Sequence, residues 1–198
     1  GYVVVSISAN GINAQDNPYS DDGGALARAQ LTLHHLDLLA KANAGQAAGM
    51  SPRLTGRVDL NRVGLMGHSR GGDGVVRTAL LNASRPKPYG INAVLPLAPI
   101  DPTRQALPDV PMAVLLPYCD GDVVSLEGQH FYEDSRYAHP GDDVLRSSLV
   151  MMGTNHNFFN TEWTPGVAVS ATTDDWKNPD DPACGPTVPT TTRLSAAD

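Results

Sequence analysis

The stretch that decides the fold runs from Arg62 to Val76 and reads Arg-Val-Gly-Leu-Met-Gly-His-Ser-Arg-Gly-Gly-Asp-Gly-Val-Val. The apolar run of residues 63–66 predicts a strand, and the residues after the last glycines predict a helix. Residues 67–71 between them form the pattern G-x-S-x-G. A serine on such a turn has its neighbours packed so tightly that glycine is expected two positions before it and two after it. Gly67 and Gly71 meet that demand.

Ser69 is the candidate nucleophile of this turn. The elbow geometry lifts a serine oxygen clear of the sheet edge, and the backbone N–H of the next residue, Arg70, faces the position where a negative oxygen develops during acyl transfer. A Gly-rich turn between a strand and a helix can also cradle a phosphate, or simply reverse the chain. The glycine spacing fits neither G-x-G-x-x-G nor the Walker pattern, so a nucleophile is the favoured interpretation.

The composition is that of one globular domain. The chain has 198 residues, of which 41% are hydrophobic and 18% charged, which is compatible with a sizeable core. A net charge of -7 argues against a nucleic-acid-binding surface and against attraction to anionic membranes. No apolar run approaches the ~20 residues of a membrane span, so no stable membrane insertion is expected. Composition indicates no oligomeric state.

Two cysteines lie far apart in the chain, Cys119 beside an acidic turn and Cys184 in a Pro-rich tail. They can be unpaired, buried small hydrophobes. However, lysine is scarce, and a bond between the two would tether a tail with little core of its own. These features favour a disulfide in a secreted protein. The cysteines lack metal-ligand spacing, and no metal site is expected.

Apolar runs that alternate with helical segments predict an α/β fold with a mainly parallel sheet. Helices are expected over residues 25–44, 72–84 and 129–137, and strands over residues 2–7, 63–66, 91–98, 112–116 and 147–152.

The ends of the chain differ in character. The chain opens on the predicted strand 2–7 with no leader or methionine, which indicates a mature or trimmed product. We assign residues 1–159 to the core. The helical and strand periodicity fades over residues 160–198, which we expect to be an irregular surface segment. Its last residues, 192–198, resemble the capped start of a helix.

Ser69, Asp122 and His156 each follow the carboxyl end of a predicted strand, where catalytic groups gather in parallel sheets. Their chain order, Ser, then Asp, then His, is that of the α/β-hydrolases. A serine hydroxyl needs a base to remove its proton, and His156 would be that base. Asp122 would hold the imidazole in the right tautomer and stabilise its charged form.

Asp120 is the alternative acid, because the turn offers two carboxylates two positions apart. We prefer Asp122, since the residue before Val123 falls deeper into the loop that faces the nucleophile. The turn can also be purely structural, or part of a calcium loop. A calcium site needs more oxygen ligands at short intervals, and only Glu127 is close.

These residues together resemble the α/β-hydrolase superfamily, and in particular bacterial secreted lipase-like and dienelactone-hydrolase-like esterases, including polyester hydrolases. The resemblance rests on residues 67–72, 120–124 and 155–158 and spans roughly residues 1–159. It implies a carboxylic-ester hydrolase without a cofactor, acting on a small or polymeric ester outside the cell. The superfamily also has strands and a helix before its counterpart of residues 2–7, a second oxyanion N–H in an earlier loop, and a final helix after the histidine. We expect this chain to lack those parts.

Two other functions fit the same pattern. The fold also serves peptidases, acyltransferases and cofactor-free perhydrolases. A catalytically inactive domain of this fold can act as a binding module. The presence of all three triad residue types argues against an inactive domain.

Overall fold

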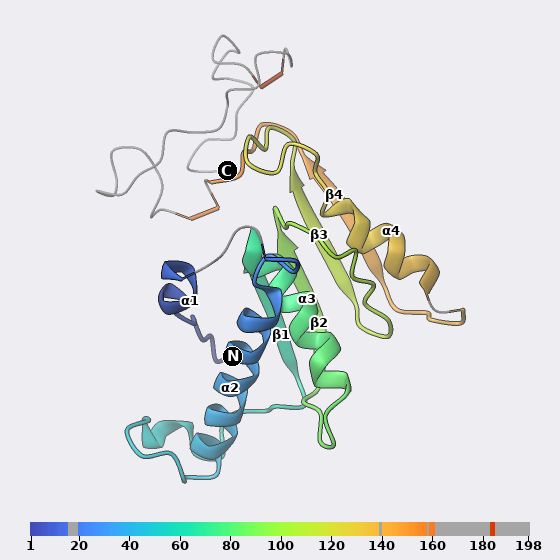
Figure 1. The fold of residues 1–198 in the computed structure, drawn as a ribbon. Helices are drawn as coiled ribbons and strands as arrows, with labels where there is room; N and C mark the ends of the chain where they lie inside the picture. Colours follow the sequence, from blue (N-terminus) through green and yellow to red (C-terminus); the bar gives the residue numbers. More distant parts are fainter. Residues whose placement is uncertain (16–19, 139, 158, 161–182, 185–198) are drawn as a thin grey trace.

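The computed structural model describes residues 1–15, 20–138, 140–157, 159–160 and 183–184. Within them, four parallel strands lie in the order β1-β2-β3-β4, which is also their order along the chain (Figure 1). The prediction of a mainly parallel sheet flanked by helices is therefore confirmed. The elements are α1 (Asn10–Ala14), α2 (Ala25–Asn43), the 3-10 helix η1 (Pro52–Leu54), β1 (Val63–His68), α3 (Arg70–Ala83), β2 (Ile91–Leu97), β3 (Met112–Pro117), α4 (Gln129–Ala138) and β4 (Arg146–Met151).

One apolar core joins the sheet to two helices. It contains buried residues from each of β1, β2 and β3, together with Val76 of α3 and Phe131 of α4, which are both 0% exposed. Because α3 and α4 contribute to the same cluster, they cover the same face of the sheet. This is what right-handed crossovers require when strands follow one another across a parallel sheet in chain order.

Helix α2 packs against α3 (Figure 1). Its buried apolar residues recur every three or four positions, as the sequence predicts, and Leu33, Leu36 and Leu39 form a second cluster with residues around Leu81 and Tyr89. The carboxylate of Asp22 accepts hydrogen bonds from two backbone N–H groups at the start of the helix. Helix α3, the element that follows Ser69, thus packs against both the sheet and α2.

The predicted strand over residues 2–7 is wrong. These residues have no strand pairing, and Tyr2 and Val4 are 99% and 89% exposed. A cavity separates this segment from β1, the nearest strand edge. Strands must lie about 4.8 Å apart to exchange backbone hydrogen bonds, so β-branched composition alone does not make residues 2–7 a strand.

The irregular segment expected over residues 160–198, including the helix start at 192–198, lies outside the described residues except for residues 160, 183 and 184. Among the described helices, none combines the length and the apolar character needed to cross a bilayer.

Candidate active site

Ser69 occupies the sharp turn between β1 and α3. Its backbone has φ 55° and ψ −127°, a left-handed conformation that non-glycine residues rarely adopt. The turn is held by two backbone hydrogen bonds: Ser69 N–H donates to Leu97 O at 2.9 Å, and Gly72 N–H donates to Ser69 O at 2.8 Å. The sequence therefore predicted the strand, the turn and the helix correctly at this position.

Of the two glycines expected to be required around Ser69, Gly67 is required by packing and Gly71 is not. A Cβ at Gly67 would lie 2.1 Å from the backbone oxygen of Gly71, so no side chain fits there. A Cβ at Gly72 would lie 2.7 Å from Pro99 Cβ. A Cβ at Gly71 would meet no atom within 4 Å. The second glycine that the packing requires is thus Gly72, because the loop after β2 presses on the start of α3 there.

His156 bridges Ser69 and a carboxylate. Its Nε2 lies 2.9 Å from Ser69 Oγ, and its Nδ1 lies 2.9 Å from Asp120 Oδ2. A carboxylate accepts, so Nδ1 carries the proton, and Nε2 is then the acceptor for the serine hydroxyl. His156 is 2% exposed and Asp120 is 4% exposed, so water competes little for either contact.

The choice of Asp122 over Asp120 does not match this geometry. Asp122 Oδ2 lies 3.3 Å from Nε2, the nitrogen that faces Ser69, and the Asp122 side chain is 69% exposed. Asp120 Oδ1 accepts hydrogen bonds from the backbone N–H groups of Asp122 and Val123, at 3.0 and 2.6 Å. These bonds fold the turn back on Asp120, which directs the first carboxylate inward and the second toward solvent.

His68, to which the sequence pattern assigns no role, contacts the backbone of His156. Its Nε2 lies 2.7 Å from the backbone oxygen of His156, and the two ring centroids are 4.8 Å apart. The Phe159 ring lies 5.9 Å from that of His68. Burial lowers the pKa of His68, and the nearby His156 lowers it further. The signal available in the sequence was its place inside the elbow motif.

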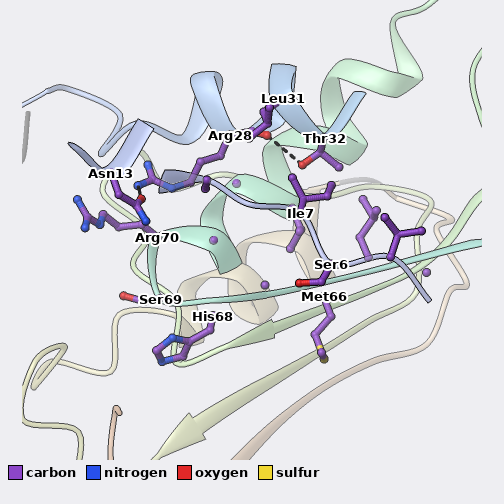
Figure 2. Close-up of a pocket in the computed structure, with 18 of the residues that line it drawn as sticks. Ser6, Ile7, Asn13, Arg28, Leu31, Thr32, Met66, His68, Ser69 and Arg70 are labelled. Carbon is purple, nitrogen blue, oxygen red and sulfur yellow. Dashed lines mark hydrogen bonds between the residues drawn. The ribbon is translucent and has the colours of Figure 1, made fainter. Parts of the chain in front are cut away.

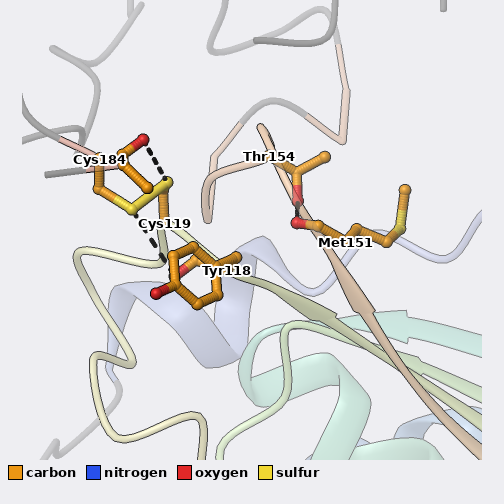
Figure 3. The surroundings of a disulfide bond; sticks show 6 residues. Tyr118, Cys119, Met151, Thr154 and Cys184 are labelled. Carbon is orange, nitrogen blue, oxygen red and sulfur yellow. Dashed lines mark hydrogen bonds between the residues drawn. A yellow bond between two sulfur atoms is a disulfide. The ribbon is translucent and has the colours of Figure 1, made fainter. Parts of the chain in front are cut away.

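A disulfide joins Cys119 and Cys184, with 5.2 Å between their Cα atoms, as the sequence favoured (Figure 3). It lies directly beside Asp120. Cys119 N–H also donates to Thr154 O at 3.0 Å, which ties the acid turn to the loop that carries His156. This hydrogen bond holds the acid turn next to the histidine loop, and the disulfide ties the same turn to Cys184.

A cavity of about 540 Å³ opens at Ser69. Its walls are residues 4–7 on one side and β1 on the other, with Leu31 and Thr32 of α2 along its length and Arg70 beside Ser69 (Figure 2). The Arg28 guanidinium, 7% exposed, also borders it and donates to Asn13 Oδ1 at 2.9 Å. The candidate nucleophile therefore borders a partly open cavity whose lining is more apolar than polar.

Two buried carboxyls lie behind the elbow. Gln105 Nε2 donates to Asp73 in the first turn of α3, and Gln105 N–H donates to Asp101 Oδ1 at 3.0 Å. Burial raises the pKa of Asp73 to about 7 and that of Asp101 to about 6, and Asp101 also raises the pKa of Asp73. Asp101 N–H in turn donates to Glu127 at 3.0 Å. No pattern in the sequence indicates this network, because a polar residue in a first helical turn is normally exposed.

A family model described as PETase, PET hydrolase-like, matches residues 1–171, a span that contains Ser69, Asp120 and His156. No curated protein matches the chain. The parallel sheet flanked by helices agrees with the fold of that family. The chain therefore belongs to the PET hydrolase-like family of α/β-hydrolases, whose members act on esters.

Proposed function

We propose that this protein is a serine esterase that cleaves carboxylic esters, polyesters included, through an acyl-enzyme intermediate. The observation that carries the proposal is the position of His156, whose two nitrogens lie 2.9 Å from Ser69 Oγ and from Asp120 Oδ2. A base in contact with a hydroxyl and oriented by a buried carboxylate is the arrangement that activates a serine. Asp120 takes the acid role in place of Asp122.

In the first half of the reaction, Ser69 Oγ attacks the acyl carbon while its proton passes to His156 Nε2. The carbonyl oxygen becomes negative, and the backbone N–H of Arg70 stabilises it. Arg70 begins α3, and the first N–H groups of a helix lie at the positive end of its dipole. The tetrahedral intermediate then collapses: the bond to the alcohol breaks, and the alcohol leaves with the proton from Nε2.

In the second half, a water molecule attacks the acyl-enzyme. His156 Nε2 takes a proton from this water, and the acyl carbon forms its new bond to the water oxygen. Collapse breaks the bond to Ser69 Oγ, which recovers the proton, and the carboxylic acid leaves. Asp120 stays ionised throughout and stabilises the imidazolium that forms in each half.

We also propose that the protein acts outside the cytoplasm. The Cys119–Cys184 disulfide supports this, because such bonds persist in oxidising compartments. A polymeric ester that cannot enter a cell would also require an extracellular enzyme.

Turnover of p-nitrophenyl esters and release of acid from a polyester film test the proposal. We expect Ser69→Ala and His156→Ala each to lower kcat by roughly 10⁴-fold or more, because nucleophile and base act as a unit. Ser84→Ala, an exposed serine after α3, is the matched control and keeps full turnover.

Other outcomes identify the alternatives. Equal ester turnover in the wild type and in His156→Ala contradicts the proposal and fits an inactive binding domain. Faster turnover of peptides than of esters assigns the same triad to a peptidase.

A further inference from the structure

We propose that His68 is a positioning residue: its Nε2–H holds the backbone of His156 so that the catalytic imidazole stays in reach of Ser69. This inference rests on the proposed function. His68 and His156 are 88 positions apart in the chain, and the 2.7 Å contact between them joins the nucleophile strand directly to the histidine loop.

The direction of this hydrogen bond follows from its atoms. A backbone carbonyl only accepts, so Nε2 of His68 must carry the proton. His68 ends β1 and immediately precedes Ser69, so its ring is fixed by the same strand that places the nucleophile. A displacement of the His156 backbone would therefore have to break this bond before Nε2 of His156 could move away from Ser69 Oγ.

Other contacts of the histidine loop come from the acid side. Cys119 N–H donates to Thr154 O at 3.0 Å, and the Thr154 hydroxyl donates to Met151 O at 2.7 Å. These bonds hold the loop relative to Asp120 and β4. The hydrogen bond from His68 holds the histidine loop relative to Ser69. The 2.9 Å contact between Ser69 Oγ and His156 Nε2 requires that the loop be held on both sides.

A neutral His68 ring suits its position beside His156 better than a positively charged one. The ring centroids of His68 and His156 lie 4.8 Å apart, and the proposed mechanism puts a positive charge on His156 twice in each cycle. A second positive charge at that distance would oppose this step. Burial, which lowers the pKa of His68, keeps the ring uncharged at neutral pH while leaving its N–H to donate.

Three substitutions of His68 separate the hydrogen bond from the volume of the ring. In His68→Gln the amide nitrogen stands the same number of bonds from Cβ as Nε2 does. In His68→Asn the amide nitrogen is one bond short. His68→Phe keeps a ring and has no donor. His34→Gln, on the exposed side of α2, is the control for loss of a histidine.

We expect kcat to fall about 10-fold in the Phe and Asn variants with KM unchanged, the effect of losing about one hydrogen bond. The Gln variant should stay within about 3-fold of the wild type. Melting temperatures measured in parallel show which variants fold. If the Phe variant does not fold, the kcat of the Asn variant provides the test. Wild-type kcat in folded Phe and Asn variants overturns the inference, and so does an equal loss in all three variants. Ester turnover that survives in Ser69→Ala and His156→Ala instead overturns the proposed function itself.

Discussion

The carboxylate of Asp120 lies 2.9 Å from Nδ1 of His156 and is almost completely buried there. Asp122, two positions later, meets the same ring at its other nitrogen from an exposed position. The two carboxylates therefore have distinguishable effects. We expect Asp120→Asn to lower kcat by roughly 10³- to 10⁴-fold, because an amide at Nδ1 no longer fixes the reactive tautomer. Asp122→Asn should lower kcat less than about 10-fold.

Ester turnover of the two Asn variants, measured at one pH and with melting temperatures to verify folding, checks this prediction. A severe loss in Asp122→Asn together with a mild loss in Asp120→Asn would return the acid role to Asp122. The wild type is the common reference for both.

The glycines of the elbow give a second prediction. A Cβ at Gly67 would collide with the backbone of Gly71. Gly71 itself is a residue of α3, and a Cβ there would meet no atom within 4 Å. Gly67→Ala should destabilise the protein by several kcal/mol, as overpacking against backbone does, and abolish ester turnover. Gly71→Ala should keep its turnover and gain up to about 1 kcal/mol, because alanine favours a helix. Urea unfolding of both variants measures this difference. Similar unfolding midpoints for the two would show that the packing around Ser69 is not as described.

The buried Asp73 makes the unfolding free energy depend on pH. Its pKa is about 7 in the folded protein against an ordinary 3.8, so the folded state keeps a proton that the unfolded chain has lost. Stability from this group is complete below about pH 3.8 and declines as pH rises toward 7. In Asp73→Asn the side chain cannot ionise. The stability of this variant relative to the wild type should therefore rise between pH 4 and pH 7 by a few kcal/mol at most.

Unfolding in urea across this pH range is the measurement, and the slope with pH is the readout. An amide beside Gln105 can lower the unfolding free energy by an amount that does not depend on pH, and such an amount does not change the slope. Asp143→Asn, an exposed carboxyl, is the control and should follow the wild type. A pH slope shared by all three proteins would show that Asp73 is ionised in the fold.

The disulfide gives a third test of stability. Cys119 and Cys184 are separated by 65 positions, and closing a loop of that length restricts the unfolded chain by about 4 kcal/mol in the chain-entropy account. Replacing both cysteines by alanine should lower the unfolding free energy by up to that amount. It should also lower kcat, because Asp120 follows Cys119 directly. An unfolding midpoint equal to that of the wild type would contradict this expectation.

The sequence predicts those parts of the molecule that local patterns determine. The run before Ser69, its turn and α3 follow from apolar spacing and glycine positions in one stretch. Residues 2–7 have equally strong strand composition, but a strand also needs a partner edge within hydrogen-bonding distance, which composition does not reveal.

In the candidate site, too, local patterns predict some residues, and others depend on tertiary structure. Ser69 and His156 follow from strand ends and chain order, whereas the choice between Asp120 and Asp122 depends on how one turn folds back through two backbone N–H groups. The contact of His68 with the His156 backbone joins segments 88 positions apart. It depends on tertiary packing, so no local pattern contains it.

Covalent labelling of Ser69 by an organophosphonate, located by peptide mass spectrometry, tests the central claim most directly. The account predicts rapid labelling of Ser69 in the wild type, labelling slowed at least 100-fold in His156→Ala, and none in Ser69→Ala. Labelling of another residue, or labelling at the same rate without His156, would contradict it.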